Sequence, residues 1–305
     1  MRRTIGGALV TLAALLGCVA CTAPAGPAPA SSAASAPVAA PSSPQAAPSP
    51  PGRSMTVAVL GDSLSRGYNA CSHFGDCPSV SWSGGTDDRV DSVATRLGAA
   101  AGARVTVRNL ARSGATVSDL ARQATEAVTL QPDLVTLLIG ANDVCRATVA
   151  DMTSTEDYTT AVSAALQQIA QYSPDTVVLV ASIPDVTALL PVAAGNPTAR
   201  FLWAQGGCAT ALQDPQSTAP DAVERRAAVS ARIREYDAAL AGACGVLPRC
   251  VTDGGALHRY TPTLQQLSAF DRFHPSVAGL RELAQLEWRA LSRSPRAAAL
   301  LEPAG

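Results

Sequence analysis

Five residues in separate parts of the chain have the types that acyl transfer requires. The reaction needs a nucleophile, a base, a group that orients the base, and hydrogen-bond donors for an oxyanion. Ser63 offers a hydroxyl, and His274 offers an imidazole with the carboxylate of Asp271 three residues before it. The backbone N–H of Gly114 and the side-chain amide of Asn142 are candidate donors. Together these residues predict a serine that attacks an ester carbonyl.

The chain contains only three histidines, which narrows the choice of base. His73 and His258 have no aspartate at the Asp-x-x-His spacing, whereas His274 has Asp271 at that position. We therefore expect His274 to take the proton of Ser63 and Asp271 to hold the imidazole in the right tautomer.

Each candidate also has a plain structural interpretation. Ser63, Asn142 or Asp143 could cap the start of a helix, which is a common role for these residue types. Gly114 could be only a turn residue, and His274 could be a hydrogen-bonded histidine at a helix start. The catalytic interpretation rests on the occurrence of all the parts together.

The elements that must position these residues alternate along the chain. Apolar, β-branched runs predict strands at 56–60, 105–110, 134–139, 176–181 and 246–251. Amphipathic periodicity predicts helices at 90–101, 117–129, 155–172, 222–241 and 275–292. This alternation predicts a three-layer α/β/α sandwich around a parallel sheet. The carboxyl ends of its strands, where open α/β sheets bind ligands, would carry the candidate residues.

In this order and in these contexts, Ser63, Gly114, Asn142 and His274 resemble the SGNH, or GDSL-type, hydrolase family of esterases and lipases. The similarity covers nearly all of residues 55–292. It implies a flavodoxin-like five-stranded parallel sheet and a Ser63–His274–Asp271 triad. It further implies an oxyanion hole made by the N–H groups of Ser63 and Gly114 and the side chain of Asn142. Such a mechanism requires no metal and no organic cofactor.

A finer similarity concerns the substrate. Residues 81–85 and 140–145 are similar to segments of the phospholipase-B-like branch, which implies acyl esters of phospholipids or lysophospholipids as substrates. The alternative for the first segment is a structural one, in which Trp82 is a core aromatic and the serines cap turns. Residues 186–219 have little periodicity and predict an insertion or lid, and residues 186–192 would suit an apolar wall.

Two other functions remain open at this point. A carbohydrate or peptidoglycan O-acetyl esterase would use the same reactive groups in an open, polar site. A non-catalytic surface binding lipoprotein would fit the N-terminal features described next, but it would have no use for a base aligned on a serine.

The N-terminus predicts export. A basic pair followed by an apolar stretch predicts a signal peptide at 1–21, and Cys18 ends a lipobox-like segment that makes it the candidate lipid anchor. Plain secretion is the alternative, because Leu16 departs from the lipobox pattern. We expect an Ala/Pro/Ser-rich disordered linker at 22–54, a hydrolase domain at 55–293 and a tail at 294–305.

Six cysteines remain outside the leader, and an even number in an exported chain predicts disulfides. Pairing close neighbours gives the candidate bridges Cys71–Cys77, Cys244–Cys250 and, by remainder, Cys145–Cys208. A metal site is not expected, because no histidine lies at ligand spacing from these cysteines.

The net charge of −1 gives no reason to expect a nucleic-acid partner. We expect a monomer that acts on a small-molecule or lipid ester, anchored to the outer face of the cell membrane if Cys18 is acylated.

Overall fold

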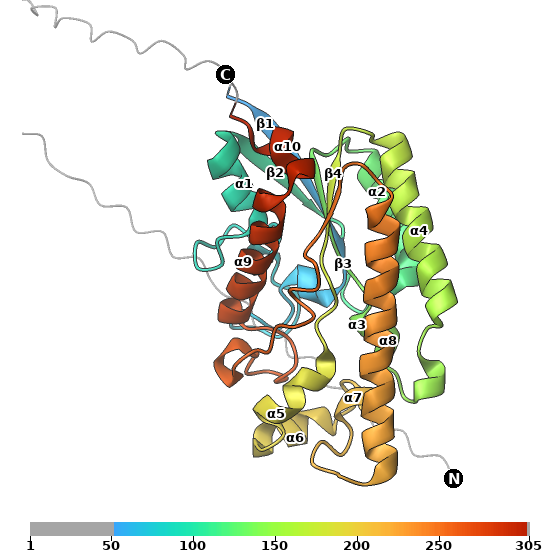
Figure 1. The fold of residues 1–305 in the computed structure, drawn as a ribbon. Helices are drawn as coiled ribbons and strands as arrows, with labels where there is room; N and C mark the ends of the chain where they lie inside the picture. Colours follow the sequence, from blue (N-terminus) through green and yellow to red (C-terminus); the bar gives the residue numbers. More distant parts are fainter. Residues whose placement is uncertain (1–51, 304–305) are drawn as a thin grey trace, which may run out of the picture. The chain divides into compact units, whose positions relative to one another are not determined.

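The computed structural model describes residues 52–303, which lie within one compact unit at residues 49–305 (Figure 1). The sheet, both core clusters and all three disulfides described below lie inside this range. The unit therefore contains the contacts that stabilise it. The predicted signal peptide, Cys18 and almost all of the predicted linker lie outside the described residues.

Five parallel strands form a single sheet in the order β2-β1-β3-β4-β5. The strands are β1 (Ser54–Gly61), β2 (Arg104–Asn109), β3 (Leu134–Leu138), β4 (Val177–Val180) and β5 (Cys250–Thr252). This order is flavodoxin-like, and it confirms the predicted α/β class.

Helices cover both faces of the sheet. They are α1 (Val93–Ala101), α2 (Leu120–Val128), α3 (Ala141–Val144), α4 (Thr155–Tyr172), α5 (Leu189–Ala193), α6 (Pro197–Trp203), α7 (Ala209–Leu212), α8 (Pro220–Gly245), α9 (Val277–Arg293) and α10 (Ala298–Leu301). Figure 1 shows α1, α9 and α10 on one side of the sheet and α2, α4 and α8 on the other. The three-layer sandwich predicted from the alternation of elements is therefore present.

The alternating side chains of the central strand explain why both faces need helices. Leu134 and Leu138 of β3 pack into the core cluster beneath α1 and α9. Val135 and Leu137, which point the opposite way, pack into the cluster beneath α2, α4 and α8. All five residues of β3 are buried, so neither face of the strand meets solvent, and the one polar side chain, Thr136, is hydrogen-bonded to Ser83.

The last strand was predicted in the wrong place. Helix α8 continues to Gly245, and Val246 adopts a helical backbone conformation at its cap with 77% of its surface exposed. Pro248 follows and has no N–H for a sheet ladder. The strand consequently begins only at Cys250 and is three residues long.

The residues that cap the helices set where they begin, and periodicity alone predicted some of these starts wrongly. The predicted helix at 90–101 begins at Val93, because Ser92 accepts a hydrogen bond from the N–H of Thr95 at 3.2 Å. The last long helix begins at Val277 after the cap Ser276.

The helix predicted at 117–129 opens with a 3-10 turn whose cap is Thr116. Pro220 starts α8 two residues before the predicted position. The helix at 155–172 has the predicted bounds.

The segment 186–219 contains short helices, α5 to α7, at the end of the sheet to which the carboxyl ends of the strands point (Figure 1). Residues 295–301, within the predicted tail, form a 3-10 turn and α10, and Ala297 is fully buried. Trp82 is likewise fully buried, as its structural interpretation required.

Disulfides join Cys71 to Cys77, Cys145 to Cys208 and Cys244 to Cys250, as predicted. Within residues 52–303 no helix has both the length and the apolar character to cross a membrane. The same residues contain no group of side chains suited to hold a metal ion.

Candidate active site

The site begins at the carboxyl end of β1, where the chain turns sharply. Gly61 has a φ of 133°, and a Cβ there would collide with the carbonyl oxygen of Leu138. Gln123 of α2 fixes this turn, since its side chain accepts from the N–H of Gly61 at 2.7 Å and donates to its carbonyl at 3.0 Å. Asp62 then caps the 3-10 turn Ser63–Arg66 by accepting from the N–H of Leu64 at 2.9 Å. Ser63 is thereby held as the first residue of that turn.

Three predicted site residues lie in one hydrogen-bonded chain. Nε2 of His274 lies 2.9 Å from Oγ of Ser63, across 211 residues of sequence. On the other side of the ring, Nδ1 of His274 lies 2.6 Å from Oδ2 of Asp271. This is the arrangement in which an imidazole can accept a proton from a hydroxyl while a carboxylate orients it.

Asp271 is held ionised by its surroundings. Burial alone would raise the pKa of this carboxyl, but hydrogen bonds from His274, Phe273 and Asn69 outweigh burial and lower the pKa. Its Oδ1 accepts from the N–H groups of Phe273 and His274 at 2.9 and 3.0 Å. An ionised Asp271 favours the Nδ1-protonated tautomer of His274, which leaves Nε2 free to act as a base.

The candidate oxyanion donors lie around the same hydroxyl. Ser63, Gly114 and Asn142 line one cleft together with His274. In the described part of the chain, the N–H groups of Ser63 and Gly114 have no hydrogen-bond partner. One hydrogen of the Asn142 amide is held by the carbonyl of Ala115 at 2.8 Å, which leaves the other available.

Glycine is required at 114 by backbone conformation. Its φ is 81°, which lies in the left-handed region, and a Cβ would meet no atom within 4 Å.

Two carboxyl groups are buried behind the candidate nucleophile. Burial raises the pKa of Asp62 to about 7. The hydrogen bond from the N–H of Leu64 and the charge of His274 lower this pKa, but their effect is smaller than that of burial. Burial also raises the pKa of Asp143, although Thr153 and the N–H of Val117 donate to this carboxyl. The hydrogen bond from the N–H of Leu64 gives Asp62 a structural role as the cap of the turn.

Two clefts meet at Ser63. The first, which we call the apolar cleft, has about 680 Å³ of empty volume including open solvent, and its wall is mostly hydrocarbon. Apart from Ser63 and Asn142, its lining includes Leu64, Val186, Leu189, Tyr260, Leu267 and Phe273. The second, the wide cleft, has about 850 Å³ on the same measure and is lined by His274, Tyr68, Trp203 and Gly207 among others. The predicted lid segment contributes to both clefts.

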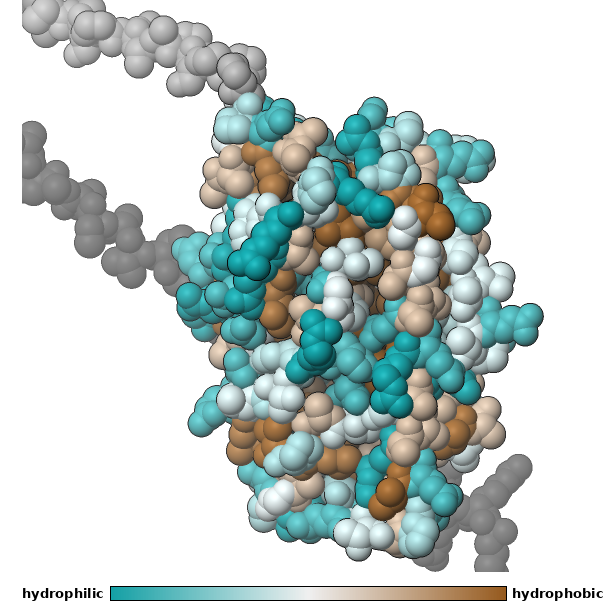
Figure 2. Space-filling view, viewed as in Figure 1, coloured by the Kyte–Doolittle hydropathy of each residue, from teal (hydrophilic) through white to brown (hydrophobic). Residues whose placement is uncertain are grey.

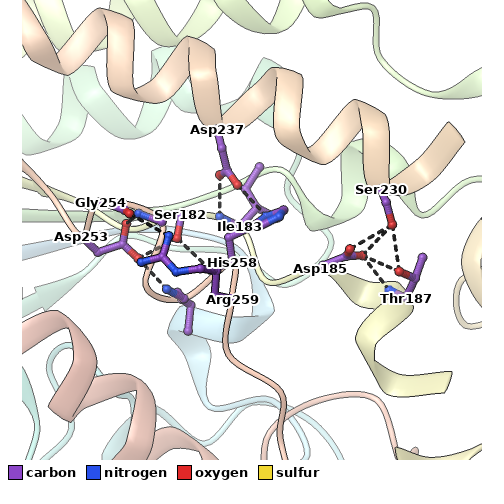
Figure 3. Close-up of polar contacts among 12 residues, drawn as sticks. Ser182, Ile183, Asp185, Thr187, Ser230, Asp237, Asp253, Gly254, His258 and Arg259 are labelled. Carbon is purple, nitrogen blue, oxygen red and sulfur yellow. Dashed lines mark hydrogen bonds and ion pairs between the residues drawn. The ribbon is translucent and has the colours of Figure 1, made fainter. Parts of the chain in front are cut away.

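Polar contacts of Asp185, itself a lining residue, fix one wall of the apolar cleft. Asp185 caps the turn Val186–Ala188 by accepting from the N–H of Thr187 at 2.9 Å. The hydroxyls of Thr187 and Ser230 also donate to Asp185, which ties the turn to α8 (Figure 3).

The other two histidines lie elsewhere. Nδ1 of His258 lies 2.8 Å from Oδ2 of Asp237 on α8, and its backbone N–H donates to Ser182 at 2.9 Å (Figure 3). Ser182 in turn donates to Asp253 at 2.6 Å. These contacts hold the loop after β5 against α8. His73 is exposed and contacts the carbonyl of Asp76.

Sequence reasoning missed two residues that support the site. Asn69 donates from its side-chain amide to Asp271 at 2.7 Å, and Gln123 holds the turn of β1. Gln123 is fully buried, yet a glutamine within a helical pattern gives no signal of its own. Asn69 has a φ of 57°, a conformation that Asn tolerates, but only the fold brings it to Asp271.

Several solved structures of other proteins are similar to this chain. The lipase Lip_vut3 from a goat rumen metagenome is 13% identical over 81% of this chain and 100% of its own, with a TM-score of 0.52. A lipase/acylhydrolase from Enterococcus faecalis is 19% identical over 77% of this chain and 94% of its own, with a TM-score of 0.48. Phospholipase A1 from Streptomyces albidoflavus is 17% identical over 77% and 98%, with a TM-score of 0.44.

Sequence comparison gives the family. No curated protein matches the chain. A family model described as the GDSL-like lipase/acylhydrolase family matches residues 59–281, a range that begins within β1, contains Ser63 and ends after His274. The chain belongs to the GDSL-like lipase/acylhydrolase family.

Proposed function

We propose that this protein is an exported serine ester hydrolase that acts through an acyl-enzyme on Ser63. The observation that carries the proposal is the chain of contacts from Ser63 through His274 to Asp271. Beside it lie N–H groups that have no hydrogen-bond partner among residues 52–303. A nucleophile, a base, its orienting carboxylate and oxyanion donors are the complete set that acyl transfer needs.

In the proposed mechanism, His274 takes the hydroxyl proton as Ser63 attacks the ester carbonyl. Asp271 stabilises the imidazolium that forms, without itself accepting the proton. His274 then gives the proton to the leaving alcohol, and the acyl group stays on Ser63. Water, deprotonated by the same imidazole, releases the acid and restores the serine.

The oxyanion of each tetrahedral intermediate would accept hydrogen bonds from the N–H groups of Ser63 and Gly114 and from the amide of Asn142. Removing one donor of this kind from a serine hydrolase typically raises the barrier by about 2.7–4 kcal/mol. The contact of Asn142 with Ala115 supports this role, because it fixes the amide before substrate arrives.

The shape of the site favours esters with a hydrocarbon acyl chain. The apolar cleft opens at Ser63, and an acyl chain bound there would remove apolar surface from water. An acetyl group, with its single methyl, could bury little of this apolar wall. We therefore favour lipid acyl esters, including phospholipids and lysophospholipids, over the acetylated carbohydrates that an O-acetyl esterase would hydrolyse.

Hydrolysis of p-nitrophenyl esters tests the proposed site. Ser63→Ala and His274→Ala should each lower kcat/KM by at least ~10³-fold. His258→Ala is the matched control, because this imidazole also contacts an aspartate but lies outside both clefts. Activity of Ser63→Ala near that of the wild type would remove Ser63 from the mechanism.

Labelling with a fluorophosphonate separates an enzyme from a binding lipoprotein. The reagent should form a covalent adduct at Ser63 of the folded protein, and His274→Ala should slow the reaction. A folded chain that stays unlabelled would favour the non-catalytic alternative.

Narrowing the apolar cleft tests the acyl-chain assignment. Val186→Phe should lower kcat/KM for a long-chain p-nitrophenyl ester roughly tenfold or more relative to the acetate, because overpacking excludes the chain. Equal losses on both esters would show that the cleft does not hold the acyl group.

Export is part of the proposal, and the three disulfides support an oxidising compartment. Mass spectrometry of the mature N-terminus tests the two forms of export. A diacylglycerol-modified Cys18 would indicate a lipoprotein, and cleavage after a later residue would indicate plain secretion.

A further inference from the structure

The phenylalanines of this chain are concentrated beside the candidate active site. The whole sequence contains four. Phe273 lines both clefts that meet at Ser63. The other three are exposed: Phe74 by 69%, Phe201 by 66% and Phe270 by 38%. We call these three side chains the phenylalanine rim.

One part of the rim is continuous with the ring of His274. The ring of Phe270 contacts that of Phe74 edge to face, with centroids 6.4 Å apart. The rings of Phe74 and Tyr68 also contact edge to face, with centroids 5.6 Å apart. The ring of Tyr68 is in turn tilted against the imidazole of His274, with centroids 4.9 Å apart. A row of aromatic rings thus leads from the surface to the candidate base.

The other part of the rim borders the wide cleft from the lid segment. Phe201 belongs to α6, and the next two residues, Leu202 and Trp203, line the wide cleft. The indole N–H of Trp203 donates to the carbonyl of Arg272 at 3.3 Å, which joins α6 to the loop that carries Phe270. Figure 2 shows hydrophobic side chains gathered at this end of the molecule, over α5 and α6.

Cationic side chains accompany the exposed rings. Arg200 precedes Phe201, and Arg272 lies between Phe270 and Phe273. Both arginines are half-buried, and in the described part of the chain neither has an acidic oxygen within 4.0 Å. Exposed aromatic rings beside arginines that have no acidic partner are complementary to a phospholipid surface. The acyl chains of the lipids can contact the rings, and their phosphate groups can contact the guanidinium groups.

We propose that the phenylalanine rim docks this protein onto a phospholipid surface, with the mouth of the wide cleft facing the lipid. Exposed aromatic side chains concentrated around one cleft are unfavourable in water and become favourable when buried at a membrane interface. The rings of Phe74, Phe201 and Phe270 enter the acyl boundary, and Arg200 contacts phosphate. The inference goes beyond the proposed ester hydrolysis, because binding to lipid requires no turnover.

Sedimentation with lipid vesicles tests the inference. Residues 49–305 with Ser63→Ala should bind vesicles of phosphatidylcholine and phosphatidylglycerol, and this inert background separates binding from hydrolysis. Adding Phe74→Ser, Phe201→Ser and Phe270→Ser should lower the partition coefficient at least tenfold, because each ring loses its favourable burial. Because this Ser63→Ala parent is inert, the binding result would stand even if the wild-type protein hydrolysed no ester.

Matched controls lie at the opposite end of the molecule. Tyr172, at the end of α4, is 58% exposed, and Val246, after α8, is 77% exposed. Tyr172→Ser with Val246→Ser should leave vesicle binding within about twofold of the parent, a change that corresponds to little apolar burial. Equal losses from the control pair and the rim variant would overturn the proposal, as would a rim variant that binds like the parent.

The charge contribution and a competing occupant are tested in the same assay. Arg200→Gln should weaken binding to phosphatidylglycerol-containing vesicles more than to pure phosphatidylcholine. A second copy of the chain could also cover the rim. Light scattering that shows a rim-dependent dimer, with vesicle binding unaffected by the rim substitutions, would assign the surface to self-association instead.

Discussion

The side-chain amide of Asn69 donates to Oδ2 of Asp271 at 2.7 Å, the same oxygen that lies 2.6 Å from the imidazole of His274. The two residues are 202 positions apart in the sequence. This contact helps to lower the pKa of Asp271, and it fixes the plane of the carboxylate that orients the base.

We expect Asn69→Asp to lower kcat about tenfold or more with little change in KM. The substitution removes the hydrogen bond from Asn69 to the charged oxygen of Asp271, and a hydrogen bond of this kind is worth about 1.5–3 kcal/mol. It also places a second negative charge beside Asp271. An aspartate still tolerates the left-handed backbone and can still accept from the N–H of Gly75, as Asn69 does at 2.8 Å. Steady-state kinetics on a soluble ester measure the effect. A raised KM with wild-type kcat would contradict the positioning role.

Asn142 is the second residue of α3, whose N-cap is Gly140, so it does not cap that helix. An oxyanion role for Asn142 predicts a different kinetic pattern from a purely structural role. Asn142→Ala should lower kcat by about 10²–10³-fold, because the amide would act on charge that develops only in the transition state. KM should change little. If Asn142 serves only to hold the backbone at Ala115 through its hydrogen bond, the substitution should lower the free energy of unfolding and leave kcat nearly intact.

Asp62 predicts a pH-dependent stability. Burial raises its folded pKa from 3.8 to about 7, so the folded chain holds a proton that the unfolded chain has lost. The contribution of Asp62 to the free energy of unfolding is fully present below pH 3.8, and it is lost as the pH rises through about 7. Asp62→Asn should therefore be more stable than the wild type at pH 8 by at most about 4 kcal/mol, and the gain should vanish near pH 4.

Urea unfolding across this pH range measures the difference between the two chains. Buried carboxyls that do not interact with Asp62, such as Glu287, affect both chains alike and cancel in the comparison, whereas the charge of Asp143 is one of the causes that raise the pKa of Asp62. A stability difference that stays constant with pH would show that Asp62 does not titrate in this window.

The three disulfides should contribute unequally. Cys145–Cys208 closes a separation of 63 residues and joins the segment after Asn142 to the lid, whereas Cys244–Cys250 spans only 6. Replacing both cysteines of the long loop by alanine should cost roughly 4 kcal/mol, and the same change in the short loop roughly 2 kcal/mol. Denaturant unfolding of the two double variants makes the comparison. Equal costs would argue against loop entropy as the main term.

Several features were open to prediction because they depend on neighbours in sequence. β-Branched runs predicted β1 to β4. In β3 and β4 every residue is buried, as the sequence runs indicated, whereas β2 alternates exposed and half-buried residues. Asp271 and His274 were paired by their spacing, because three residues bring a carboxylate and an imidazole together within one turn of loop. Ser63 was placed by the strand that precedes it.

The tertiary structure alone decided which distant segments meet. Asn69 reaches Asp271, Gln123 braces Gly61, and the lid brings Trp203 to the loop at Arg272, each across tens to hundreds of residues. Periodicity and local spacing carry no information about such contacts, because they depend on how packed layers fold the loops over one edge of the sheet. The position of β5 also depended on where α8 ends. The strand was predicted to begin at Val246 because that residue is apolar, but α8 extends to Gly245 and the strand begins only at Cys250.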